Sequence, residues 1–176
     1  IDGIKETHDK IRGESFEKIE KNLRKYVEET GKKIWISMTI NSWNSDQIIE
    51  VAEYWKDFAD GINFQIHTPF MENDPLWIPY GKYRNELLDK IITLKRKYPN
   101  YVIHEEDQLN LLRSPWGGDK TKPINCPNWA ILVLDHRAES KTPCCLGSAK
   151  SDDQKPICEY CGMSNYSSLF SRGIHL

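Results

Sequence analysis

The order of helix-like and strand-like segments in the first hundred residues most constrains the fold. Apolar residues recur at helical spacing between Ser15 and Gly31, after Asn44 or Ser45, and from about Gly81 to Lys97. Between these stretches, segments 33–41 and 62–67 alternate apolar and polar residues, as half-buried strands do. A helical connection between two strands places them parallel in one sheet. The sequence therefore predicts an α/β fold with a parallel sheet and outer helices.

Short polar and flexible residues mark where these helices begin and end. Ser15 can cap the first helix, Asn44 or Ser45 can cap the second, and Gly31 suits the end of the first. A short strand at 101–103 and a helical stretch at 107–113 follow, before a segment rich in proline and glycine. We expect an α/β domain at 1–113, a linker at 114–125 and a cysteine-rich module at 126–176.

Two or three strands covered by helices on one side would leave an open sheet edge. Such an edge is an aggregation hazard that folded proteins cover or pair. The chain also begins at Ile1 without a methionine or a leader. We therefore expect further residues before Ile1 to complete the sheet as its N-terminal half.

The charge and hydropathy of the chain narrow the classes of partner. The formal net charge is −2, and acidic and basic residues are mixed along the helices, which argues against nucleic acid as a partner. The longest apolar runs, such as Ala130–Leu134, are too short to span a membrane. Without a signal peptide, a cytoplasmic location is the expectation.

Polar residues follow both predicted strands at their carboxyl ends. In parallel α/β folds, ligands bind at this end of the sheet. We therefore expect Asn41, His67 and Thr68 to line a binding site. Alternatively, these three side chains only satisfy one another and nearby backbone groups.

His8 and Arg12 lie one helical turn apart and can project together. The guanidinium of Arg12 could bind a carboxylate or phosphate with two hydrogen bonds. The alternative, favoured by spacing alone, is a surface ion pair of Arg12 with Asp9 or Glu14.

All the cysteines lie after residue 125, in the last third of the chain. They are Cys126, Cys144, Cys145, Cys158 and Cys161. A predicted β-hairpin at 128–143 brings the first of them close to the adjacent pair, and the final Cys-x-x-Cys step closes the site. Clustered thiolates bind zinc or an iron–sulfur cluster, and their clustering makes buried, unliganded cysteines the weaker alternative.

Four of the five cysteines suffice for one metal centre. Neighbouring residues seldom bind one centre together, so one of Cys144 and Cys145 is surplus. The predicted ligands are Cys126, Cys144, Cys158 and Cys161, with Cys145 as the alternative to Cys144. The chemical nature of the metal, iron–sulfur or zinc, stays open at this point.

Several of these motifs together resemble the radical S-adenosylmethionine enzymes. The residues that carry the likeness are Asp2-Gly3, His8-Asp9-x-x-Arg12-Gly13, the strand at 35–41, the strand end at 65–70, Pro143-Cys-Cys-Leu-Gly147 and Cys158-x-x-Cys161-Gly162. The last two resemble the auxiliary cluster module called SPASM or twitch, and its shorter twitch form fits better.

The resemblance implies the second half of a partial, six-stranded TIM-like (β/α) barrel followed by a [4Fe–4S] auxiliary cluster in a cysteine-rich β-hairpin module. Arg12 matches the position that contacts the carboxylate of S-adenosylmethionine, and Asn41, His67 and Thr68 match positions near its adenosine or the substrate. The implied reaction is hydrogen abstraction from a small-molecule or peptide substrate by a 5′-deoxyadenosyl radical.

One departure from the family concerns the catalytic cluster. Its C-x-x-x-C-x-x-C loop is absent from this sequence, so we expect the segment alone to be inactive and the full-length enzyme to be the active form. No catalytic residue is assigned. The alternative function is a non-catalytic, zinc-stapled module that binds a peptide or protein. A disulfide-linked protein outside the cytoplasm is a third class, which nothing in the sequence supports.

Overall fold

The computed structural model describes residues 1–115, 134, 137–140 and 156–162, and all structural statements below concern these residues. The elements, in chain order, are α1 (Lys5–Arg12), α2 (Phe16–Thr30), β1 (Trp35–Ile40), α3 (Ile48–Trp55), β2 (Gly61–Ile66), α4 (Lys82–Lys97), α5 (Glu106–Leu111) and the 3₁₀ turn η3 (Cys158–Tyr160). This order confirms the predicted mixture of helices and strands.

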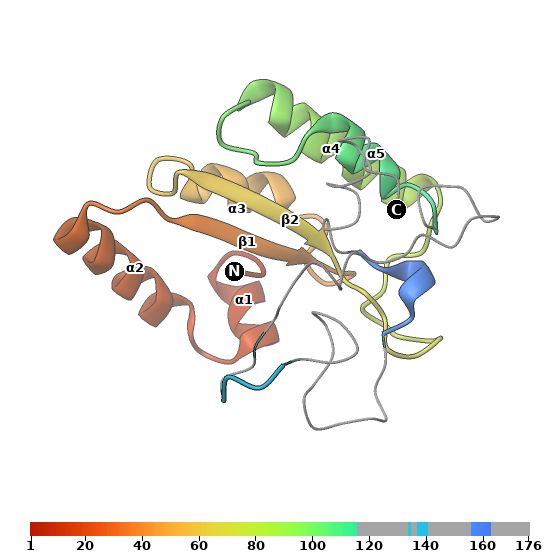
Figure 1. Ribbon diagram of the computed structural model, residues 1–176, viewed down its shortest axis with the longest axis horizontal. Coiled ribbons are helices and arrows are strands. Elements are labelled where there is room, and N and C mark those ends of the chain that lie inside the picture. The colour runs from red at the N-terminus through yellow and green to blue at the C-terminus, as the bar shows by residue number, and fades with distance from the viewer. Residues whose placement is uncertain (116–133, 135–136, 141–155, 163–176) are drawn as a thin grey trace.

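Strands β1 and β2 form a two-stranded parallel sheet. Their register pairs Ile36 with Ile62, Met38 with Phe64 and Ile40 with Ile66. Helix α3 connects the strands, which is the helical crossover that parallel neighbours require. Figure 1 shows both arrows pointing the same way, with η3 beyond the arrowheads at their carboxyl ends.

The two faces of the sheet differ in polarity as the period-two pattern predicted. The six residues of the three pairs named above are buried on one face, where the side chains of α3 and α4 complete the core. The other face carries Ser37, Thr39, Asn63 and Gln65, which are partly or fully exposed. Ser37 and Asn63 face each other across the strands with their side-chain atoms 3.3 Å apart.

Helices α3 and α4 supply most of the apolar surface that covers the sheet. The apolar residues that they bury are Ile48, Val51, Ala52, Trp55, Leu87, Leu88, Ile91, Ile92 and Leu94. Burial of one such side chain is worth about 1.5–3 kcal/mol, so this layer is the main source of stability. Helix α2 joins the same core through Phe16, whose ring contacts those of Tyr54 and Trp55.

The predicted helix starts are right to within a few residues, but the side chains predicted to cap the N-termini of α2 and α3 do not do so. Helix α2 follows Ser15, yet the Ser15 hydroxyl bonds the ring of His8. The carboxylate of Asp9 instead accepts the N–H groups of Ser15 and Phe16, at 2.9 and 2.8 Å. A side chain six residues upstream therefore performs the capping, because α1 folds back beside the start of α2.

The predicted cap of α3 is also wrong. Helix α3 starts after Gln47, which has no side-chain cap, and the side chain of Asn44 bonds the backbone of Asn41. The C-cap prediction at Gly31 is confirmed, since this residue is left-handed (φ 62°) and donates its N–H to Val27. Only a residue without a Cβ adopts this conformation at no steric cost.

Two further segments differ from the expectation in extent. Segment 101–103 forms a single parallel bridge between Val102 and Ile62 instead of a full strand. In the predicted hairpin, Leu134 and Ser140 form an antiparallel bridge, and the remainder of that hairpin lies outside the described residues. Nearly all of the predicted linker at 114–125 also lies outside the described residues.

Within the described residues, no helix has the length and apolarity needed to cross a membrane.

Candidate functional site at the carboxyl end of the sheet

The carboxyl ends of β1 and β2 bring three predicted site residues to one edge. Asn41 follows β1 directly, and His67 and Thr68 follow β2. The N–H of His67 donates to the carbonyl of Ile40 at 2.8 Å, which extends the parallel pairing by one residue. The structure therefore brings Asn41, His67 and Thr68 together where parallel sheets bind ligands.

The side chain of Asn41 is committed to a local turn. It is buried, and its Oδ1 accepts the N–H of Trp43 at 2.8 Å. Its own N–H donates to Oδ1 of Asn44, whose side-chain amide then bonds the carbonyls of Asp2 and Thr39. Asn41 therefore shapes the loop after β1. This agrees with the alternative in which its side chain only satisfies nearby backbone groups.

Arg12 is held on the β1 side of the site by a buried carboxylate. Its Nε donates to Oδ2 of Asp2, while Oδ1 of Asp2 accepts the N–H of Thr39 at 3.0 Å. The partner of Arg12 is thus Asp2 and not Asp9 or Glu14, which spacing had suggested. The Arg12 side chain is 57% exposed and that of Asp2 4%, so the guanidinium faces solvent beside the end of β1.

His8 completes this cluster from inside the fold. The N–H of Asp2 donates to its Nδ1 at 3.1 Å, which leaves Nε2 to donate to the hydroxyl of Ser15. Burial lowers the pKa of His8. The ring is therefore neutral and structural at pH 7, and only Arg12 of this predicted pair is accessible to a ligand.

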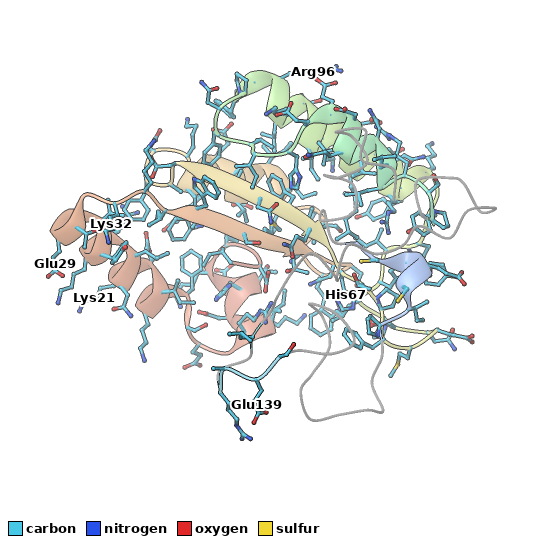
Figure 2. The ribbon with its side chains drawn as sticks, viewed as in Figure 1. Lys21, Glu29, Lys32, His67, Arg96 and Glu139 are labelled. Atoms are coloured by element: carbon cyan, nitrogen blue, oxygen red, sulfur yellow. The ribbon has the colours of Figure 1, made fainter. Side chains whose placement is uncertain are left out.

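On the β2 side, His67 pairs with a carboxylate from the loop that follows. Nε2 of His67 lies 2.9 Å from Oδ2 of Asp74, and both side chains are largely buried. Burial alone would raise the pKa of Asp74, but hydrogen bonds from His67 and from the N–H of Leu76 outweigh it and lower this pKa. The carboxylate fixes the ring orientation of His67, which points Nδ1 away from Asp74. Figure 2 marks His67 beside the η3 segment.

The Cys158–Cys161 turn lies directly against this end of β2. The N–H of Ile66 donates to the carbonyl of Gly162 at 3.0 Å, and the N–H of Gly162 donates to Oγ1 of Thr68 at 2.8 Å. A third bond runs from the N–H of Ile157 to the carbonyl of Pro69 at 2.9 Å. Segments about ninety residues apart in sequence are thus joined at the predicted ligand edge.

Aromatic side chains fix the same turn from its other side. The ring of Tyr160 stacks on that of Trp77, with centroids 4.4 Å apart and an interplanar angle of 25°. Tyr80 donates its hydroxyl to the carbonyl of Glu159 at 3.3 Å, and its ring covers the guanidinium of buried Arg84. Trp77, Tyr80 and Arg84 all come from the β2–α4 loop or the start of α4.

Two of the predicted metal ligands can be placed. Cys158 is exposed, Cys161 is half-buried against the core, and the N–H of Cys161 donates to the carbonyl of Cys158 at 3.1 Å. This tight turn sets both thiols on one short segment, which suits a shared metal centre. Cys126, Cys144 and Cys145 lie outside the described residues. Within the described part of the chain, no three metal-ligating side chains meet.

Sequence reasoning missed Asp74 and Trp77, and it named Asp2 only within the Asp2-Gly3 motif, without a role. Asp74 and Trp77 lie in a loop without periodicity, and the partners of Asp2 are distant in sequence, so no local pattern marks these contacts. A separate groove of about 390 Å³ lies between α3 and α4, lined mainly by charged residues, and none of the predicted site residues lines it. Comparison with known protein families, curated proteins and solved structures finds no match for this chain.

Proposed function

We propose that this chain is a portion of a radical S-adenosylmethionine enzyme and that its cysteines bind an auxiliary [4Fe–4S] cluster. In this proposal the parallel α/β part belongs to a partial barrel, and the carboxyl end of its sheet binds S-adenosylmethionine and the substrate. The substrate is a small molecule or a peptide. Support comes from the sequence motifs together with the contacts at this sheet edge.

The observation that carries the proposal is the docking of the cysteine turn on β2. Gly162, next to Cys161, hydrogen-bonds both Ile66 and Thr68. A metal bound by this turn would lie beside the edge where parallel sheets bind their ligands. A structural metal that only braced a distant tail would not need this contact.

The side chains at the edge have distinct tasks in this function. Arg12 is oriented by Asp2 through Nε, which leaves its Nη groups to bind the carboxylate of S-adenosylmethionine. His67 is oriented by Asp74 and offers Nδ1 to the adenosine or the substrate. Bound S-adenosylmethionine would supply 5′-deoxyadenosyl radical chemistry for hydrogen abstraction, given one electron from a catalytic cluster whose C-x-x-x-C-x-x-C loop this sequence lacks. Asn41 holds the loop after β1.

A zinc-stapled module that binds a peptide or protein is the second candidate. The tight Cys158–Cys161 turn also suits a zinc site, because thiolates one short turn apart occur in both kinds of centre. Phe70 and Met71 are exposed and lie shortly after Thr68 in the loop between β2 and α4. Such apolar side chains can contribute to a peptide-binding surface.

Metal analysis separates the two candidates. The chain is purified without oxygen, and iron, acid-labile sulfide and zinc are measured per polypeptide. We expect about four irons and four sulfides, as one cubane cluster contains. About one zinc without sulfide favours the binding module. No metal after reconstitution overturns both, and the C158S/C161S double variant controls for adventitious iron.

A further inference from the structure

We propose that Thr68 and Gly162 are positioning residues that hold the Cys158–Cys161 turn in register on the end of β2 and so fix where its metal lies. This role rests on the proposed function for the metal itself. The contact that fastens the turn is present in the protein chain alone and can be measured separately. It assigns to Thr68 a task other than the ligand contact expected from sequence.

The hydroxyl of Thr68 is built into the contact. Thr68 is buried, and its Oγ1 accepts the N–H of Gly162 at 2.8 Å. Without this oxygen the buried N–H of Gly162 would lose its acceptor, which is costly for a buried donor. The adjacent bond from Ile66 to Gly162 copies the pairing of a strand, so the two bonds together set the register of the turn.

Gly162 is required because of space and not because of its backbone angles. A Cβ at this position would lie 1.8 Å from the carbonyl oxygen of Ile66 and 2.5 Å from its carbonyl carbon. Backbone atoms cannot move away as a flexible side chain can. Only glycine permits this approach, so any side chain at 162 would lift the neighbouring Cys161 off β2.

The register fixes the relation between the metal site and the ligand edge. Thr68 is the neighbour of His67, and Gly162 is the neighbour of Cys161. The hydrogen bond between Thr68 and Gly162 therefore links His67, the candidate ligand contact, to Cys161, the candidate metal ligand. Trp77 and Tyr160 hold the turn from the opposite side, so loosening Thr68 should tilt the turn without releasing it.

The first test measures the fastening in the reduced, metal-free chain. Site-resolved alkylation compares half-buried Cys161 with exposed Cys158 as an internal reference. We expect T68V, which keeps the shape but removes the acceptor, to raise the labelling rate of Cys161 roughly tenfold. T68S should restore the wild-type rate. T93V is the matched control, because it removes a threonine hydroxyl from an exposed position on α4.

G162A tests the close approach independently. It should raise Cys161 labelling at least as much as T68V. G31A controls for general destabilisation, because its left-handed backbone makes alanine costly while its Cβ meets nothing within 4 Å, so it should leave Cys161 labelling unchanged. Labelling of Cys161 that stays at the wild-type rate in both T68V and G162A overturns the proposal.

The second test measures the metal with Co²⁺ as the probe. Its thiolate absorption bands report both affinity and geometry, and neither depends on enzyme activity. T68V should weaken Co²⁺ binding several-fold and shift the bands, while T68S and T93V match the wild type. Faster labelling with an unchanged Co²⁺ spectrum and affinity overturns the positioning role. If the wild-type chain binds no metal, the proposed function fails, and the labelling result alone then decides whether Thr68 fastens the turn.

Discussion

The carboxylate of Asp2 lies between the side chain of Arg12 and the main-chain N–H of Thr39. It accepts Arg12 Nε with one oxygen and Thr39 N–H, at 3.0 Å, with the other. Asp2 is buried and Arg12 is half exposed. Asp2 is therefore a structural residue, and it orients the accessible side chain of Arg12.

The two bonds of Asp2 should contribute unequally to stability. D2N keeps an oxygen for the N–H of Thr39 but loses the ion pair and hydrogen bond with half-exposed Arg12, whose Nε–H can turn to solvent, and we expect this to cost about 1 kcal/mol. D2A also leaves that N–H without an acceptor and should cost about 1–3 kcal/mol more. Urea denaturation measures both free energies of unfolding. Equal losses in D2N and D2A would show that the bond to Thr39 contributes nothing.

His104 should make the protein less stable in mild acid. It is 2% exposed, and its Nε2 accepts the N–H of Phe64 at 2.9 Å. Burial, aided by the charge of Lys95, lowers its pKa from 6.5 to about 4. The unfolded chain therefore binds more protons between these two values, so stability falls as the pH drops from about 6.5 to about 4. The slope from this residue is at most about 1.4 kcal/mol per pH unit.

The variant H104Q isolates this effect, because glutamine does not titrate and still offers an oxygen to Phe64. Its unfolding free energy should depend less on pH than that of the wild type over the same window. Buried His8 acts in the same direction. Glu53, whose pKa the hydrogen bond from Lys97 lowers to about 2, acts at lower pH. Both are unchanged in H104Q, so identical slopes in the two proteins would contradict the assignment to His104.

The sheet was predictable because its pattern is local and strict. Apolar residues alternate from Ile34 to Ile40 and from Ile62 to Ile66, and these are the side chains that the core buries. The order of strand, helix and strand then fixes a parallel pairing. The positions of Asn41, His67 and Thr68 at one edge follow from the same argument.

Helix α1 could not be predicted from periodicity. It is eight residues long, and His8 is the only residue that it buries. Asp2 and Asp9 fold it against β1 and the start of α2 through hydrogen bonds between side chain and backbone. Such bonds depend on the tertiary approach of segments and leave no repeat in the sequence.

The contacts of the Cys158–Cys161 turn could not be predicted from the sequence either. Gly162 lies 94 residues from Thr68, and the sequence shows only a glycine after a Cys-x-x-Cys step. The pairing of His67 with Asp74 arises in a proline-containing loop without periodicity. Residue types predicted the candidate ligands, whereas the partners that orient them depend on three-dimensional packing.

Trp77 allows the stacking contact to be separated from the indole N–H. The buried Nε1 has no hydrogen-bond partner within the described residues, so W77F loses no hydrogen bond there and should cost only about 1 kcal/mol for the smaller ring. W77A removes the whole half-buried ring that stacks on Tyr160 and should cost more, about 2–3 kcal/mol. Hydrogen exchange of segment 156–162 should rise in W77A and not in W77F. Equal protection in all three proteins would mean that the stack does not hold the turn.

The choice between Cys144 and Cys145 can be settled with single serine variants. We expect C126S, C144S, C158S and C161S each to lose most of the bound metal, because a centre held by four thiolates then lacks one bond. C145S should keep the wild-type metal content and absorption spectrum, since adjacent side chains seldom reach one centre. Metal loss in C145S with retention in C144S would reverse that assignment. Retention in both C158S and C161S would show that the turn docked on β2 is not part of the metal centre, and the proposed function would lose the observation that carries it.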